Sequence, residues 1–243
     1  MHLYPYLLSP SPDTPFPPAE HALREPNGLL AVGGDLTPQR LLAAYGGGIF
    51  PWFTEEQPLL WWSPDPRTVF RSDSIHLSRR FRRSLRTSTW TVRADSMFAA
   101  VIDACACTSR RGQDGTWITA NMREAYLTLH RLGYAHSVEV FDGIMLVGGL
   151  YGVALGHMFF GESMFSTRNG ASKIALASLA NFLHTHNMPL IDAQVENQHL
   201  LNLGAERWPR NDFLAHVRRL VTETGLPTCW NTLFGEHLSR DLA

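Results

Sequence analysis

Three polar side chains in the second half of the chain are candidates for catalysis: Glu162, Asp192 and Gln194. Glu162 lies in the run HMFFGESMF, and a carboxylate among bulky apolar side chains is rarely left without a partner or a role. Asp192 and Gln194 are two residues apart in PLIDAQV, so on a strand they would point to the same face. A carboxylate beside a donor amide, close to Glu162, predicts a site for proton transfer and oxyanion stabilisation.

The elements that would position these residues follow one another from His157 to Leu203 as strand, loop, helix, strand and helix. Apolar residues recur with a helical period between Gly170 and His184, and a helix that crosses between two strands predicts a βαβ unit. Such units bind ligands at the carboxyl ends of their strands. The start of the helix, near Lys173, could hold a phosphate or a carboxylate, although an ordinary cap with a solvated lysine explains the same residues.

The remaining segments complete a mixed α/β (α+β) chain of two domains. Residues 1–65 are rich in proline, glycine and tryptophan and predict a small N-terminal α/β domain, whereas residues 66–243 would form the larger catalytic domain. Asn121 and Glu124 are spaced like a capping box, and Asp142-Gly143 is typical of a hairpin turn. Periodicity and stop signals predict helices over residues 37–45, 77–86, 93–107 and 116–132.

Composition limits the classes of function. A chain of 243 residues with 44% hydrophobic content can bury a full core. Three cysteines cannot all pair and the N-terminus lacks a basic region followed by an apolar core, which indicates a cytoplasmic protein. The longest uncharged run, residues 143–161, holds six glycines and fits hairpin strands better than a membrane span. Cys105-x-Cys107 and His184-x-His186 do not have the spacing of a metal site.

Arginine is concentrated in one segment. The net charge is −1, yet the segment from Arg71 to Arg93 has seven arginines and one acid, and Lys173 is the only lysine beside twenty arginines. In HLSRRFRRSLR, apolar residues repeat every four positions and arginines occupy the opposite face of the expected helix. An arginine-rich genome or a solvated helix face explains such a run, but an RNA phosphate backbone is the natural partner of uncompensated arginines.

Eight blocks in order resemble the leucyl/phenylalanyl-tRNA–protein transferase family. They are EPNGLLAVGGDLTPQRLLAAYGGGIFPWF, LLWWSPDPR, GTWIT, GYAHSVEV, VGGLYGVALG, FGESMFS, ASK and LIDAQV. The resemblance implies a cytoplasmic, monomeric enzyme with a GNAT-like acyltransferase domain, without coenzyme, metal or membrane. It would move leucine or phenylalanine, with methionine as a further candidate, from aminoacyl-tRNA to proteins that begin with arginine or lysine, and so mark them for degradation.

That function suggests roles for individual residues, of which the resemblance itself supplies only the lining of the apolar pocket. Asp192 would act as base, Gln194 would orient the amine or the oxyanion, and Glu162 would bind the acceptor's cationic side chain or organise the site. The apolar pocket for the amino acid would be lined by Trp52, Trp117, Leu150, Phe159, Met164, Leu179, Leu183 and Ile191. The tRNA would be bound by Arg79, Arg80, Arg82, Arg83, Arg86 and Lys173.

Some alternatives remain open from the sequence alone. Trp52, Trp61 and Trp62 either form a local core or one wall of the pocket. The same fold could host a coenzyme-A-dependent acetyltransferase, although STRNGAS lacks the glycine pattern of a pyrophosphate loop. A peptidyltransferase that uses aminoacyl-tRNA and a non-catalytic tRNA-binding protein are the other candidates, and the second would not need Asp192 and Glu162 in an aromatic setting.

Overall fold

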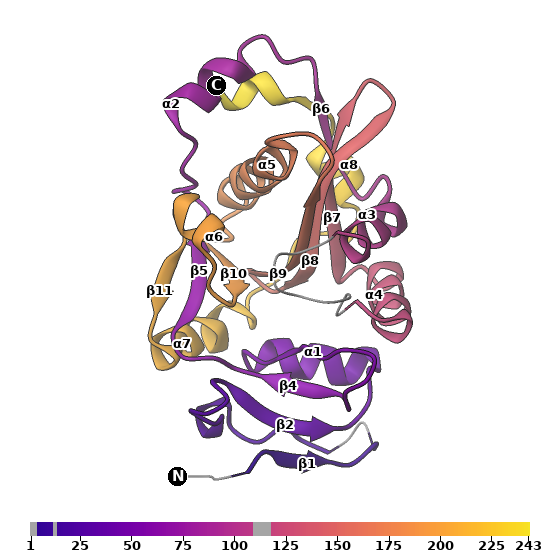
Figure 1. Cartoon of the computed structure of the whole chain (residues 1–243), viewed down its shortest axis with the longest axis vertical. Helices are drawn as coiled ribbons and strands as arrows, with labels where there is room; N and C mark the ends of the chain where they lie inside the picture. The colour runs from indigo at the N-terminus through magenta and orange to yellow at the C-terminus, as the bar shows by residue number, and fades with distance from the viewer. Residues whose placement is uncertain (1–3, 12–13, 109–117) are drawn as a thin grey trace.

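The computed structural model describes residues 4–11, 14–108 and 118–243. Within these residues the chain forms a four-stranded sheet and an eight-stranded sheet (Figure 1). The strands are β1 (Tyr6–Leu8), β2 (Leu29–Gly33), β3 (Phe50–Pro51), β4 (Leu60–Trp62), β5 (Arg67–Arg71), β6 (Thr91–Ala94), β7 (Ala135–Asp142), β8 (Met145–Leu155), β9 (Met158–Ser166), β10 (Leu190–Gln194), β11 (Glu206–Trp208) and β12 (His237–Leu238). The α-helices are α1 (Pro38–Gly46), α2 (Arg79–Leu85), α3 (Phe98–Ala106), α4 (Ala120–Arg131), α5 (Ala171–Thr185), α6 (Gln198–Asn202), α7 (Arg210–Leu220) and α8 (Trp230–Phe234), and two short 3-10 helices cover Ala19–His21 and Ser239–Leu242.

The large sheet contains the predicted βαβ unit. Its strand order is β11-β5-β10-β9-β8-β7-β6-β12, and β9 and β10 are parallel neighbours joined by α5. The hairpin between β7 and β8 turns at Gly143, as predicted, with a φ of 61° that suits glycine. The parallel pairing of β9 and β10 ends at Phe160 and Asp192. Gln194 therefore lies at the carboxyl end of β10, whereas Glu162 lies in the middle of β9, just beyond the point where β9 stops pairing with β10.

Helices cover both faces of this sheet (Figure 1). Helix α5 lies against one face, with β7 and β8, while α3 and α4 lie against the other. Gly148 on β8 permits the close approach of α5, because a Cβ atom at this position would lie 2.4 Å from Cβ of Ala171. Two apolar cores result, one on each side of the sheet.

The four-stranded sheet, in the order β1-β2-β4-β3, lies at the N-terminal end of the molecule (Figure 1). Helix α1 begins as predicted, with Thr37 accepting a hydrogen bond from the Arg40 N–H and Pro38 in the first turn. Helix α1 packs beside α4 and β8, and its buried residues Leu41 and Tyr45 belong to the same core as Tyr126 and Tyr151. The small sheet is thus joined to the large one through a continuous apolar core.

Two helix predictions are corrected. Residues 93–107 are not one helix, because Thr91–Ala94 forms strand β6 and α3 begins only at Phe98. These residues form a strand because Val92 and Ala94 are buried where β6 pairs with β7, and Val92 also pairs with β12. The helix expected over 116–132 is α4, whose described part begins at Ala120, and its cap is Thr119 rather than the predicted Asn121–Glu124 box.

The remaining helix predictions hold with small changes of length. The helix expected over 77–86 is α2, which spans seven residues and is capped by Ser78. Among the described residues, no helix is both long and apolar enough to cross a bilayer.

Candidate active site

Glu162 is held by three hydrogen-bond donors from three different elements. The phenol of Tyr45 on α1 donates to Oε1 at 2.8 Å, and the Gln194 amide on β10 donates to the same oxygen at 2.7 Å. The phenol of Tyr126 on α4 donates to Oε2 at 2.8 Å, and the two phenol oxygens lie 2.5 Å apart. The carboxylate therefore joins α1, α4, β9 and β10 at one point.

The surroundings of Glu162 bring its pKa close to neutral pH. Burial raises the pKa of Glu162 to about 7, and the hydrogen bonds from its three donors only partly offset that increase. Burial also raises the pKa of Tyr45 and of Tyr126 well above the usual value for a phenol. The two tyrosines consequently remain neutral donors, and Glu162 is the group of this network that can exchange a proton near pH 7.

Asp192 is paired with an arginine that the sequence analysis did not identify. Arg67 on β5 donates to Asp192 through Nε at 2.8 Å and through Nη2 at 2.6 Å. Both side chains have a relative exposure of 0%. The guanidinium also donates to the Gly48 carbonyl at 3.1 Å and lies 4.8 Å and 4.6 Å from the ring centroids of Phe50 and Phe213. Arg67 thus ties β10 to the N-terminal region and to α7.

The expected alternation of Asp192 and Gln194 on a regular strand is corrected by the geometry of β10. The register against β5 shifts between these two residues, and Gln194 has a φ of 59°. Asp192 Oδ1 accepts the backbone N–H of Gln194 at 2.9 Å, which fixes this bulge. The two side chains consequently have different partners, since Asp192 binds Arg67 and Gln194 binds Glu162.

A cavity of about 1040 Å³ opens beside this network, where β9 and β10 separate. Six of the eight residues expected to form the apolar pocket line it: Trp52, Leu150, Phe159, Met164, Leu179 and Ile191. Leu183 does not line it and lies instead in the core beneath α5. Trp117 is outside the described residues. Glu162, Asp192 and Gln194 line the same cavity, so its surface combines apolar side chains with these three polar ones.

The three tryptophans of the N-terminal region divide between the two roles considered for them. Trp61 is fully buried in the core. Trp52 lines the cavity and makes an edge contact with Trp62, whose indole N–H donates to the Trp52 carbonyl. The N-terminal region therefore supplies one wall of the cavity.

Helix α2 presents the predicted arginines on the surface, far along the molecule from the N-terminal sheet (Figure 1). Arg79, Arg80, Arg83 and Arg86 are exposed, and no ion pair to them occurs within the described part of the chain. Arg82 differs, because it donates to the Leu242 carbonyl at 2.8 Å and so ties α2 to the C-terminal residues.

Lys173, at the start of α5, adjoins the same helix. Its ammonium lies 5.6 Å from the centre of the Phe81 ring of α2. Within residues 4–11, 14–108 and 118–243, no group of three or more histidine, cysteine and acidic side chains is arranged to hold a metal ion.

Sequence reasoning missed Tyr45, Tyr126 and Arg67, the two tyrosines for one reason and the arginine for another. Tyr45 and Tyr126 occupy buried positions of amphipathic helices, where a tyrosine usually signals only the core. The one available signal was the polar tip that a buried tyrosine must satisfy. Arg67 is 125 residues from its partner Asp192, and no local pattern connects them.

Comparisons with known proteins give a consistent result. A family model described as leucyl/phenylalanyl-tRNA protein transferase matches residues 69–218, and the model of its N-terminal domain matches residues 34–65. A Xylella fastidiosa (strain 9a5c) protein named leucyl/phenylalanyl-tRNA–protein transferase is 86% identical over 100% of both chains. A Xanthomonas campestris pv. campestris (strain B100) protein of the same name is 68% identical over 98% of this chain and 96% of its own. Among solved structures, L-PGS from Bacillus licheniformis is a distant resemblance, with a TM-score of 0.40, 9% identity, and 81% of this chain and 74% of that chain covered.

Proposed function

This chain belongs to the leucyl/phenylalanyl-tRNA–protein transferase family, and from that premise we propose that it moves leucine or phenylalanine from aminoacyl-tRNA to the α-amino group of a protein that begins with arginine or lysine. The observation that carries this proposal is the cavity of about 1040 Å³, which is lined both by apolar side chains and by Glu162 and Gln194. An amino acid side chain fits the apolar part of this lining, and amine chemistry fits the polar part.

The reaction requires few catalytic groups from the protein. The α-amine attacks the ester carbonyl, a C–N bond forms, the C–O bond to the tRNA ribose breaks, and the ribose hydroxyl leaves with a proton. Because the ester is already activated, the enzyme needs to hold a neutral amine against the carbonyl and to accept its proton. No nucleotide hydrolysis is required.

We assign the role of proton acceptor to Glu162. Its pKa of about 7 lies close to that of an α-amino group, which is about 8. Proton transfer between the two groups is therefore nearly balanced at neutral pH. Because the Gln194 amide nitrogen faces Glu162, its amide oxygen is the atom that can accept a hydrogen bond from the amine and orient it.

Asp192 supports this arrangement through its contacts with Arg67 and Gln194. Both of its oxygens accept hydrogen bonds from Arg67, so Asp192 is already engaged as a hydrogen-bond acceptor by a buried partner. Its contact with the Gln194 backbone holds the bulge that directs the Gln194 side chain toward Glu162. We therefore propose Asp192 as a positioning residue for Gln194 rather than as the base that the sequence suggested.

The leucine or phenylalanine side chain would occupy the apolar part of the cavity, between Trp52 and helix α5. Leu179 faces this cavity, whereas Leu183, one turn later on the same helix, lies in the core. Both leucines are fully or almost fully buried, at 1% and 0% exposure. They form a matched pair for a test of specificity.

Replacing Leu179 by alanine should enlarge the pocket and shift the preference toward phenylalanine over leucine by about tenfold, the usual effect of a methylene group or two in such a pocket. Each substitution should lower the free energy of unfolding by about 2–5 kcal/mol. Leu183→Ala should nevertheless leave the preference between phenylalanine and leucine unchanged. The measurement is kcat/KM for leucyl- and phenylalanyl-tRNA with one acceptor peptide. If the two variants show the same preference, Leu179 does not contact the transferred amino acid.

We also propose that helix α2 binds the tRNA through its phosphates. Arg79, Arg80, Arg83 and Arg86 offer exposed guanidinium groups, and contacts of this kind position an RNA without reading its sequence. Arg82 belongs to this set by position, although its hydrogen bond to the Leu242 carbonyl gives it a second, structural role.

Single replacement of Arg79, Arg83 or Arg86 by glutamine should weaken tRNA binding by similar modest steps. Each lost contact should reduce the log–log salt slope by about 0.7 to 0.9, and a double replacement should reduce it by nearly twice as much. Arg82→Gln should in addition lower thermal stability. A salt slope that is unchanged in the Arg79/Arg83/Arg86 triple variant would mean that α2 faces solvent in the complex.

The acceptor would approach the polar part of the cavity. Three carboxylates line it, Glu162, Asp192 and Glu196, and no lysine or arginine does so among the described residues. Although Asp192 and Glu196 are paired with Arg67 and Arg207, the lining favours a cationic first residue over an anionic one.

We infer that the domain boundary lies near residue 65, since β4 ends at Trp62 and β5 begins at Arg67. We further infer that the larger domain is of the GNAT-like acyltransferase type, and that the protein acts in the cytoplasm, where aminoacyl-tRNA is found. A monomer is sufficient for this function, because the described residues of one chain supply the cavity and the arginine helix.

The test of the proposed function is one incubation with matched substrates. Purified protein is given labelled leucyl-tRNA and a peptide that begins with arginine, and the peptide mass is expected to increase by one leucine. The same peptide with an acetylated N-terminus should not react, and a peptide that begins with glutamate should react poorly. Acetyl-coenzyme A in place of the tRNA should give no product, and acetylation of the peptide would favour the acetyltransferase alternative.

A further inference from the structure

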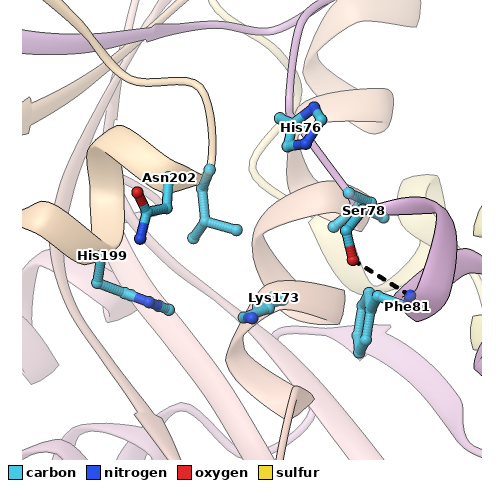
Figure 2. A pocket seen from close by; sticks show the side chains of 8 residues that line it. His76, Ser78, Phe81, Lys173, His199 and Asn202 are labelled. Carbon is cyan, nitrogen blue, oxygen red and sulfur yellow. Dashed lines mark hydrogen bonds between the residues drawn. The ribbon is translucent and has the colours of Figure 1, made fainter.

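A second, smaller cavity of about 350 Å³ lies between the start of α2, the start of α5 and helix α6 (Figure 2). Its lining residues come from three separate parts of the chain and include no acid: His76, Leu77, Ser78, Phe81, Lys173, His199, Asn202 and Leu203. Figure 2 shows the Lys173 side chain between His199 and Asn202 on one side and the α2 residues on the other. The cavity therefore combines one cation with several hydrogen-bonding side chains.

Lys173 lies in this cavity beside an aromatic ring. Within the described ranges of the chain no ion pair to its ammonium occurs, and the Phe81 ring is its aromatic neighbour. Phe81 is itself fixed against α5, since a Cβ atom at Gly170 would lie 2.5 Å from its ring and Gly170 has a φ of 88°. An ammonium held beside an aromatic ring with no acid nearby is suited to bind an anion.

The side chains opposite Lys173 can supply neutral donors. Burial lowers the pKa of His199, and the neighbouring Lys173 charge lowers it further, so the imidazole is neutral at pH 7 and keeps one N–H donor. Asn202 offers an amide on the same helix. The walls are joined by the hydrogen bond from the His76 backbone N–H to the Leu203 carbonyl at 2.8 Å.

The location of the small cavity indicates which anion it would meet. His199 lines both this cavity and the large one, so the two adjoin at α6. On the other side, Ser78 and Phe81 belong to the cap and first turn of the arginine helix α2. An RNA strand that extends from the α2 surface to the apolar pocket would therefore pass the small cavity just before it reaches the pocket.

We propose that the small cavity binds the phosphodiester that joins the last two nucleotides of the aminoacyl-tRNA, through Lys173 with His199 and Asn202. This inference rests on the proposed function and adds to it a site for one defined group of the substrate. The phosphate lies one nucleotide away from the ester, so its capture fixes the end of the RNA and sets the depth to which the amino acid enters the large cavity. Helix α2 then binds the preceding part of the tRNA.

The experiment compares three small substrates, of which the two dinucleotides differ in a single charge. The first is an aminoacyl adenosine without phosphate, the second is the aminoacyl dinucleotide with one phosphodiester, and the third is that dinucleotide with a neutral methylphosphonate link. Amide-linked versions are used for dissociation constants by calorimetry, and ester versions for transfer to the arginine peptide. The protein variants are Lys173→Met, Lys173→Arg and, as a surface control of the same charge change, Arg219→Gln on the exposed side of α7.

The parent protein should bind the phosphodiester dinucleotide about tenfold more tightly than the methylphosphonate, as expected for one charge-assisted contact. Lys173→Met should abolish this ratio while binding of the adenosine compound stays unchanged. Lys173→Arg and Arg219→Gln should keep the ratio. A retained ratio in Lys173→Met, or an equal loss for the adenosine compound, overturns the phosphate site. Binding is measured separately from transfer, so absence of transfer by the parent protein would count against the proposed function alone.

Discussion

Glu162→Gln is expected to lower turnover by about 10²- to 10⁴-fold, the usual contribution of a general base, while tRNA binding stays unchanged. The substitution keeps the size of the side chain and its contacts with Tyr45 and Tyr126, but removes the group that accepts the proton. The same change at Glu139 is the matched control. Glu139 is also buried, its pKa is also raised by burial, and it accepts hydrogen bonds from Ser96 and Ser137 rather than lining the large cavity.

The pH dependence distinguishes a base from a structural carboxylate. Glu162 must be ionised to accept a proton, so the parent rate should increase as the pH rises through about 7. In Glu162→Gln this limb should disappear, and the remaining rate should follow only the acceptor amine, whose pKa is about 8. Glu139→Gln should retain the limb and most of the turnover. If Glu162→Gln keeps the limb near pH 7, or if both variants lose activity equally, Glu162 is not the proton acceptor.

The Glu162→Gln variant also tests acceptor specificity. If Glu162 also attracts the cationic first residue, Glu162→Gln should lower activity more for a peptide beginning with arginine than for one beginning with a neutral residue. An equal decrease for both peptides would restrict Glu162 to proton transfer.

The local parts of this site could be predicted because local patterns determine them. The change from strand to helical periodicity identified β9, α5 and β10, and the charge of Glu162 within an aromatic run marked it as unusual. Strand β6 was missed because four residues are too few for the alternation of Val92 and Ala94 to outweigh the helical pattern that follows.

The contacts that organise the site could not be predicted, because they join distant segments. Tyr45 and Tyr126 meet Glu162 across 117 and 36 residues, and each by itself looked like an ordinary core residue of a helix. The bulge at Gln194 likewise depends on a register shift against β5. A sequence pattern assumes regular strands, so it placed Asp192 and Gln194 together and could not show that Asp192 is occupied by Arg67.

Arg67→Met is expected to destabilise the protein by about 3–5 kcal/mol, because it leaves the Asp192 carboxylate buried without its partner. Asp192→Leu should cost a similar amount, since it leaves Arg67 unpaired. Urea unfolding gives both values. Arg123→Met is the control, because it breaks a bidentate pair with Asp103 on the surface and should cost less than about 1 kcal/mol.

The double variant Arg67→Met/Asp192→Leu separates stability from function. Apolar replacement of a buried ion pair is often nearly neutral, so much of the lost stability should return. Turnover should not return, because the carboxylate that holds the Gln194 N–H and its bulge is gone. The amide of Gln194 would then no longer be directed at Glu162, and the amine would lose its orientation although the protein is folded. Recovery of turnover together with stability would show that the pair serves the fold alone, and that Gln194 keeps its conformation without Asp192.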